Sequence, residues 1–93
     1  MVTKDQKTYK VATIKNELGL HARSAAQIAR LAGNSSGNIW LKKDDKKADA
    51  SSIIDILTLE CEKGTEITII IENLADIKIL NAIVDLVDNG FGE

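Results

Sequence analysis

The feature that most constrains this 93-residue sequence is its switch between two hydrophobic periods. Apolar residues at every second position favour strands, whereas apolar residues at every third or fourth position favour helices. In the segment 63–72, Ile67, Ile69 and Ile71 alternate with other residues, so we expect them to point into a core. These periods predict strands over 7–14, 36–43 and 63–72, a turn with a short strand over 44–50, and helices over 22–32, over 51–60 and from residue 73 to residue 89.

The ends of the two longer helices carry signals in the sequence. The segment 22–32 is rich in alanine, the best helix former, and Gly33 and Asn34 follow it as a stop. Asn73 is a suitable N-cap for the last helix, and Asp76 would place a negative charge in its first turn. The apolar stripe of that helix is expected to pack across a sheet, and it comprises Ile77, Leu80, Val84 and Val87, widened by Ile79, Ile83 and Leu86.

The resulting order of elements is β-α-β-β-α-β-α. Amphipathic helices beside alternating strands indicate an α+β open-faced β-sandwich, with a four-stranded, mainly antiparallel sheet and three helices on one face. Trp40 lies out of phase with Ile39 and Leu41, so we expect it on the open face of the sheet. The length predicts a single domain over 1–93, in which the polar residues 1–6 are expected to be disordered.

Composition excludes several classes of function. Twelve basic and 14 acidic residues give a net charge of −2, and the chain has three aromatic residues, so a nucleic-acid partner is not expected. Cys61 is the only cysteine, which excludes an internal disulfide and, with a single histidine, a zinc site of cysteines and histidines. Because no signal peptide and no apolar run of about 18 residues is present, we expect a cytoplasmic protein without membrane insertion.

The only histidine, His21, stands directly before the predicted helix 22–32. Histidine is not a favoured N-cap, so its placement there calls for an explanation, although a lone histidine can also be merely structural or exposed. The first turn of a helix has unpaired N–H groups and a partial positive charge, which together attract anions. Ala22, Arg23 and Ser24 can each offer an N–H group, and the Arg23 guanidinium suits phosphate oxygens. The sequence therefore predicts an anion site that contains a nucleophilic imidazole.

Two segments resemble a known family. "GLHARSA" at 19–25 resembles the active-site segment of the histidine-containing phosphocarrier proteins, HPr, of the bacterial phosphotransferase system, which normally reads Gly-Leu-His-(Ala or Thr)-Arg-Pro-Ala. "ADASSIIDILTL" at 48–59 resembles the helix that carries a regulatory serine in that family. The resemblance continues through "KGTEITI" to "GFGE" and covers residues 7–93, and "KNELGLHAR" is closer to the nitrogen-related branch of the family.

The resemblance implies a fold and a function. The family has the same β-α-β-β-α-β-α order and relays phosphoryl groups: Enzyme I passes the group to the Nδ1 atom of the carrier's histidine, and an enzyme IIA domain takes it. His21 would then be the phosphohistidine acceptor, and Arg23, Ala22 and Ser24 would bind the phosphate. A monomeric carrier of this kind is no enzyme and needs no metal or cofactor. The alternative is a regulatory module that docks on an HPr kinase or a transcriptional regulator and is switched by phosphorylation.

Two positions depart from the family pattern or leave its use open. Ser24 replaces the proline of the motif, and we expect its N–H and hydroxyl groups to lie near the phosphate. Ser52 matches the serine that is phosphorylated in some members, but it also suits the N-cap of the helix predicted over 51–60. Asp55 lies one turn away and would repel a phosphate on Ser52. We therefore favour the capping role for Ser52.

Overall fold

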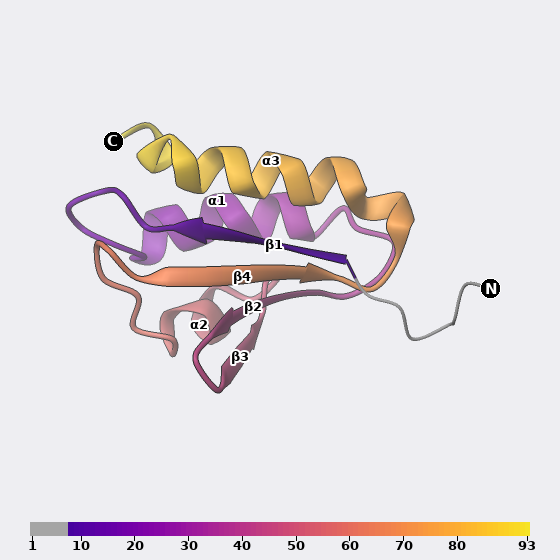
Figure 1. Cartoon of the computed structure of the whole chain (residues 1–93), viewed down its shortest axis with the longest axis horizontal. Helices are drawn as coiled ribbons and strands as arrows, with labels where there is room; N and C mark the ends of the chain where they lie inside the picture. The colour runs from indigo at the N-terminus through magenta and orange to yellow at the C-terminus, as the bar shows by residue number, and fades with distance from the viewer. Residues whose placement is uncertain (1–7) are drawn as a thin grey trace.

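Four short strands form one antiparallel sheet in the computed structural model, which describes residues 8–93 (Figure 1). The strands are β1 (Thr8–Thr13), β2 (Ile39–Lys43), β3 (Lys46–Asp49) and β4 (Glu66–Ile71), and their order in the sheet is β1-β4-β2-β3. Each predicted strand is present but shorter than its hydrophobic pattern. The expectation for residues 1–6 lies outside the described residues.

The alternation of side chains gives the sheet one buried and one open face. Ile67 and Ile69 are completely buried and Ile71 is 1% exposed, as the sequence predicts, because every second residue of a strand faces the helices. Trp40 lies opposite Ile70 on the open face, also as predicted. Its indole Nε1 donates a hydrogen bond to Glu72, and the Lys47 ammonium lies 4.3 Å from the centre of its ring.

Three α-helices cover the other face: α1 (Ala22–Ala32), α2 (Ile53–Leu57) and α3 (Ile77–Asp88). Helix α1 has the predicted bounds, whereas α2 is a short helix within the predicted 51–60. Figure 1 shows α3 lying along the sheet beside α1, with the end of α3 near the loop that joins β1 to α1. Two 3-10 turns flank α3: η1 (Leu74–Asp76) and η2 (Gly90–Gly92). The molecule is therefore the α+β open-faced sandwich that the sequence predicts.

The start of α3 differs from the prediction. Asn73 does cap a helical turn, since its side chain accepts a hydrogen bond from the Ala75 N–H, but that turn is η1, and α3 begins only at Ile77. Asp76 is 2% exposed, and its carboxylate accepts hydrogen bonds from the backbone N–H groups of Ser36 and Gly37, at 2.8 and 2.9 Å. Asp76 therefore lies in the first turn after Asn73, as predicted, but its carboxylate binds a distant loop as well.

The buried stripe of α3 is shifted with its start. Leu80, Ile83 and Val87 are completely buried, whereas Ile77, which the pattern assigned to the stripe, is 37% exposed.

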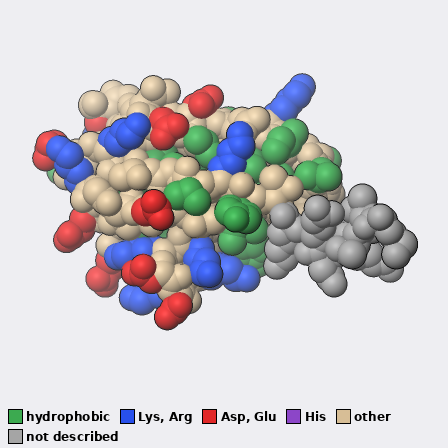
Figure 2. Space-filling view, in the orientation of Figure 1, with side chains coloured by type: hydrophobic (Ala, Val, Ile, Leu, Met, Phe, Trp, Pro, Cys, Tyr) green, Lys and Arg blue, Asp and Glu red, His purple; other side chains and the backbone are tan. Residues whose placement is uncertain are grey.

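None of the helices described within residues 8–93 is long and apolar enough to cross a membrane. Acidic and basic side chains are interspersed over the face shown in Figure 2, so the small net charge is not concentrated there in one pole.

Candidate functional site

The loop between β1 and α1 places His21 at the beginning of α1. Gly19 adopts φ +66°, and a Cβ atom at this position would lie 2.4 Å from the carbonyl oxygen of Cys61. Only glycine fits this conformation and this close approach. The next residue, Leu20, donates its N–H to the same Cys61 oxygen at 2.8 Å, which fixes the loop on the segment before β4. His21 then occupies the N-cap position in extended conformation.

Ser24 lies inside this turn and does not face solvent. Its side chain is completely buried, and its Oγ atom accepts the His21 N–H at 3.0 Å while lying 3.1 Å from the His21 carbonyl oxygen. The hydroxyl therefore closes the first turn of α1 by binding a backbone donor that would otherwise be unpaired. Local backbone groups thus already use the hydroxyl that the sequence places near the phosphate.

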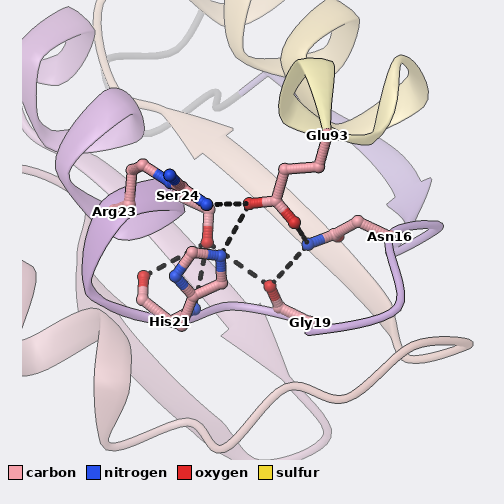
Figure 3. A network of polar contacts seen from close by, with 6 residues as sticks. All are labelled: Asn16, Gly19, His21, Arg23, Ser24 and Glu93. Carbon is pink, nitrogen blue, oxygen red and sulfur yellow. Dashed lines mark hydrogen bonds and ion pairs between the residues drawn. The ribbon is translucent and has the colours of Figure 1, made fainter.

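Glu93, which sequence reasoning missed, contacts the imidazole directly (Figure 3). Its Oε2 atom lies 2.6 Å from Nε2 of His21 and 4.0 Å from Nη2 of Arg23. The fold brings Glu93 there through η2, in which Phe91 is buried with φ +59° and Glu93 donates its N–H to the Gly90 carbonyl oxygen. A side chain 72 positions away from His21 in sequence thus forms one side of the site.

Asn16 holds the other oxygen of the same carboxylate. Its Nδ2 atom donates hydrogen bonds to Glu93 Oε1 at 3.0 Å and to the Gly19 carbonyl oxygen at 2.8 Å (Figure 3). These contacts stabilise the charged form of Glu93. The Asn16 hydrogen bond, followed by that of His21, lowers the pKa of the Glu93 carboxyl below its ordinary value of 4.5.

The geometry leaves one ring nitrogen and several amides available. Glu93 contacts Nε2 and not Nδ1 of His21, whose side chain also forms a capping box with the Ser24 backbone N–H, and the His21 side chain is 28% exposed. The backbone N–H groups at the start of α1 have no partner within the helix, by the geometry of any first turn. Ala22 is exposed, and the Arg23 side chain is 71% exposed. The site can therefore present a nucleophilic nitrogen, amide donors and a guanidinium to an anion from solution.

Ser52 lies at the start of α2 and acts as its N-cap. Its Oγ atom accepts the Asp55 N–H at 3.2 Å, and the Asp55 carboxylate in turn accepts the Asp49 N–H at 2.7 Å. The neighbouring Ser51 is exposed, and its hydroxyl donates to Asp49. The structure thus contains the predicted cap, and it keeps the Asp55 carboxylate in the same turn as Ser52.

Comparison with known proteins identifies the family. The sequence profile described as "PTS HPr component phosphorylation site" matches residues 8–89. This chain belongs to the HPr family. Phosphocarrier protein HPr of Cupriavidus necator is 33% identical over 81 residues, which cover 87% of this chain and 91% of that protein. Phosphocarrier protein NPr of Shewanella violacea is 41% identical over 81 residues, which cover 87% of this chain and 89% of that protein.

A solved structure agrees with the assignment to the HPr family. The crystal structure of HPr-C-His from Thermoanaerobacter tengcongensis superposes with a TM-score of 0.83 at 37% identity, covering 92% of this chain and 97% of the other. The predicted fold and the resemblance to HPr are therefore confirmed. Proteins of this family carry phosphoryl groups within the phosphotransferase system and are not themselves enzymes. The matched residues 8–89 include His21 and Ser52 but not Glu93.

Proposed function

We propose that this HPr-family chain accepts a phosphoryl group from Enzyme I on Nδ1 of His21 and passes it to an enzyme IIA domain. The observation that carries the proposal is the arrangement of the imidazole, whose Nε2 contacts the Glu93 carboxylate at 2.6 Å while its other nitrogen, Nδ1, is not bound by that carboxylate. A neutral imidazole that donates from Nε2 has its free electron pair on Nδ1. That electron pair is the nucleophile that phosphoryl transfer requires.

The transfer needs only this chain's own groups and the donor. The Nδ1 electron pair forms a bond to phosphorus while the bond between phosphorus and the donor breaks, and the electron pair of that bond leaves with the donor. The phosphorylated ring then carries a proton on Nε2 that Glu93 can accept as a hydrogen bond. In the second transfer the acceptor attacks phosphorus, and the N–P bond returns its electrons to Nδ1.

The phosphate oxygens need donors at the start of α1. We assign this role to the Arg23 guanidinium and to the backbone N–H groups of Ala22 and Ser24, because the first turn of a helix directs unpaired donors at an anion. The Arg23 side chain extends into solvent, and its contact within residues 8–93 is the Glu93 carboxylate at 4.0 Å, so it can turn to an incoming phosphate. The hydroxyl of Ser24 is excluded from this role by its bonds within the turn.

Partners and location follow the same proposal. Membership of the HPr family implies partners among the phosphotransferase enzymes, and we propose that the chain meets Enzyme I and an enzyme IIA domain as a monomer in the cytoplasm. The 41% identity to an NPr protein supports a partner of the nitrogen-related branch. Purified Enzyme I and IIA proteins of both branches, offered in parallel, would show which pair transfers phosphate through this chain.

Phosphorylation of His21 can be tested directly. The chain is incubated with phosphoenolpyruvate and Enzyme I, and the modified residue is mapped by mass spectrometry. We expect one phosphoryl group on His21 that is labile in acid and stable in alkali, and that moves to an added IIA domain. His21→Ala, a change at a partly exposed position, should fold and remain unlabelled. Labelling of another residue in this variant would overturn the assignment.

For Ser52 we propose the structural role of a helix cap. Its hydroxyl oxygen is already bound to the Asp55 N–H, and a phosphate there would meet the Asp55 carboxylate in the same turn. Ser52→Ala should cost about 1 kcal/mol of stability, as the loss of a serine cap usually does. Incubation with ATP and HPr kinase should give little labelling. Efficient labelling that is lost in Ser52→Ala but kept in Ser51→Ala would instead favour the regulatory module.

A further inference from the structure

Asn16 is a buried polar residue that the phosphoryl transfer proposed above does not use. It is 6% exposed and lies before the histidine motif, in the loop between β1 and α1. Its Nδ2 atom donates to two oxygens that belong to different parts of the site, the Gly19 carbonyl and Glu93 Oε1. Its Oδ1 atom has no hydrogen-bond partner within residues 8–93. The amide is therefore held entirely through its donors.

The two acceptors define which side chain can occupy this position. Both oxygens carry negative or partial negative charge, and a planar NH₂ group offers one hydrogen to each. An aspartate of the same size would place its own carboxylate oxygens against both acceptors. An alanine would leave the Glu93 Oε1 atom without its only donor within residues 8–93. The position thus requires a short side chain with two N–H groups.

Fixing one oxygen of a carboxylate fixes the direction of the other. With Oε1 held by Asn16, the Oε2 atom lies 2.6 Å from Nε2 of His21, at the distance of a strong charge-assisted hydrogen bond (Figure 3). A carboxylate can only accept, so the neutral ring must carry its proton on Nε2. We propose that Asn16 is a positioning residue that orients Glu93 and thereby sets the tautomer of His21 in which Nδ1 is unprotonated.

The proposal deepens the proposed function, but its first readout does not depend on phosphoryl transfer. A structural residue that merely braces the Gly19 loop would change the stability of the fold when removed and leave the tautomer of His21 as it is. A positioning residue would change the tautomer in a folded protein. The tautomer can be read from the nitrogen chemical shifts of the ring, because the protonated and unprotonated nitrogens differ strongly.

The experiment measures ¹⁵N shifts of the His21 ring at a pH where the ring is neutral. The variants are Asn16→Ala, Asn16→Asp and, as a control with the same chemical change, Asn38→Asp, at an exposed position directly before β2. We expect the Nε2–H form to dominate in the wild type and in Asn38→Asp. The excess of the Nε2–H form over the Nδ1–H form should fall in Asn16→Ala. It should fall further in Asn16→Asp, in which two carboxylates face each other.

A second variant tests whether Asn16 acts through Glu93. The tautomer ratio of Glu93→Ala should match that of Asn16→Ala. The ratio in the double variant should differ from that in either single variant by less than twofold, because Asn16 acts on His21 through Glu93 and the two effects are not additive. An unchanged tautomer ratio in folded Asn16→Ala would overturn the proposal. So would a double variant whose change in tautomer ratio equals the sum of the changes in the two single variants. If Asn16→Ala did not fold, Glu93→Ala with the wild-type ratio would overturn it as well.

Phosphoryl transfer from Enzyme I provides the last arm. We expect transfer to Asn16→Ala to be slower by about tenfold, the lower end of the loss that follows when the hydrogen-bond partner of a metal-bound histidine, oriented in a similar way, is removed. A wild-type rate in Asn16→Ala would overturn the link to transfer. If the wild type accepted no phosphate on His21, the proposed function would fail, whereas a tautomer shift in Asn16→Ala would still support the positioning role.

Discussion

The two ends of α3 each have a carboxylate that binds a distant loop, but the two carboxylates have different kinds of partner. Asp76, before the helix, is 2% exposed and accepts two backbone N–H groups from the loop between α1 and β2. Glu93, after the helix, has a side chain that is 19% exposed, and its carboxylate contacts the side chains of Asn16, His21 and Arg23 among the residues that the structure describes. The carboxylate at one end is bound by backbone N–H groups, and the carboxylate at the other end is bound by side chains that can move.

This difference separates a structural contact from a contact that chemistry can use. Backbone N–H groups in a loop cannot turn away, so loss of the buried Asp76 carboxylate would leave two partly buried donors without their partner. A histidine ring and an arginine can exchange a carboxylate for a phosphate at little cost to the fold. We therefore expect the same functional group, a carboxylate, to serve stability at one end of the helix and the proposed phosphoryl transfer at the other.

The largest expected effect is the loss of the Asp76 carboxylate. Asp76→Ala should lower the free energy of unfolding by about 2–4 kcal/mol, because two backbone donors lose their partner. Asp76→Asn should cost less, since one oxygen remains as an acceptor. Urea unfolding measures both variants. Asp88→Ala, which removes an exposed carboxylate 3.8 Å from Lys15, is the matched control and should change stability by less than about 0.5 kcal/mol. Equal effects of Asp76→Ala and Asp88→Ala would refute the contrast between a buried and an exposed carboxylate.

The opposite pattern is expected for Glu93. Glu93→Gln should slow phosphoryl transfer to His21 by about tenfold, because the neutral amide is a weaker partner for the Nε2 proton. Its free energy of unfolding should stay within about 0.5 kcal/mol of the wild type, as for most surface substitutions. Assays of phosphoryl transfer quenched at successive times give the transfer rate, and urea unfolding of the same preparation gives the free energy of unfolding. A marked loss of stability with a normal rate of transfer would mean that Glu93, like Asp76, has a structural role, and would contradict the difference between the two ends of α3.

Arg23 provides a smaller test of the mobile end. Arg23→Ala should slow transfer several-fold, because the phosphate loses a charged donor, while the melting temperature stays nearly unchanged for a side chain that is 71% exposed. Arg30→Ala, near the other end of α1 and also exposed, controls for the loss of one positive charge. Equal slowing in both variants would mean that Arg23 acts through net charge alone.

The smallest effect is expected from acid. The pKa of Glu93 is lowered in the folded chain, mainly by Asn16 and then by His21, so its contacts add stability above the ordinary pKa of 4.5 and lose it as the pH falls through the folded value. NMR titration of the Glu93 side-chain carboxyl should give a midpoint below 4.5 in the wild type. In Asn16→Ala the midpoint should rise. A wild-type midpoint at or above 4.5 would contradict the contacts described here.

Much of the fold could be predicted from the sequence because it depends on local periodicity. The inward positions of Ile67, Ile69 and Ile71 follow from alternation alone, and the bounds of α1 follow from alanine and a glycine stop. The candidate histidine could also be found locally, because it is the only one and it stands at a helix start. The start of α3 was misplaced, because the α-helix follows a 3-10 turn and Asp76 has partners 39 and 40 positions away in sequence.

The site was only half predicted for the same reason. Asn16 and Glu93 contact each other across 77 positions, and no periodic pattern relates them. The sequence places the Ser24 hydroxyl near the phosphate but does not reveal that it binds the nearest backbone donor, which here is the His21 N–H. The one available signal for Glu93 was the resemblance of its segment, "GFGE", to the C-terminal end of the family, which lies outside the matched residues 8–89.

The carboxylates at both ends of α3 also set a limit on its length. Each residue in an α-helix turns the chain by about 100° and advances it by about 1.5 Å. A single insertion or deletion within Ile77–Asp88 would therefore rotate Glu93 away from Asn16 or Asp76 away from the loop at Gly37. The fold should tolerate substitutions on the exposed side of α3, whereas it should not tolerate insertions or deletions of single residues in this helix. In this protein the helix acts as a spacer whose length is matched to the distance between two loops.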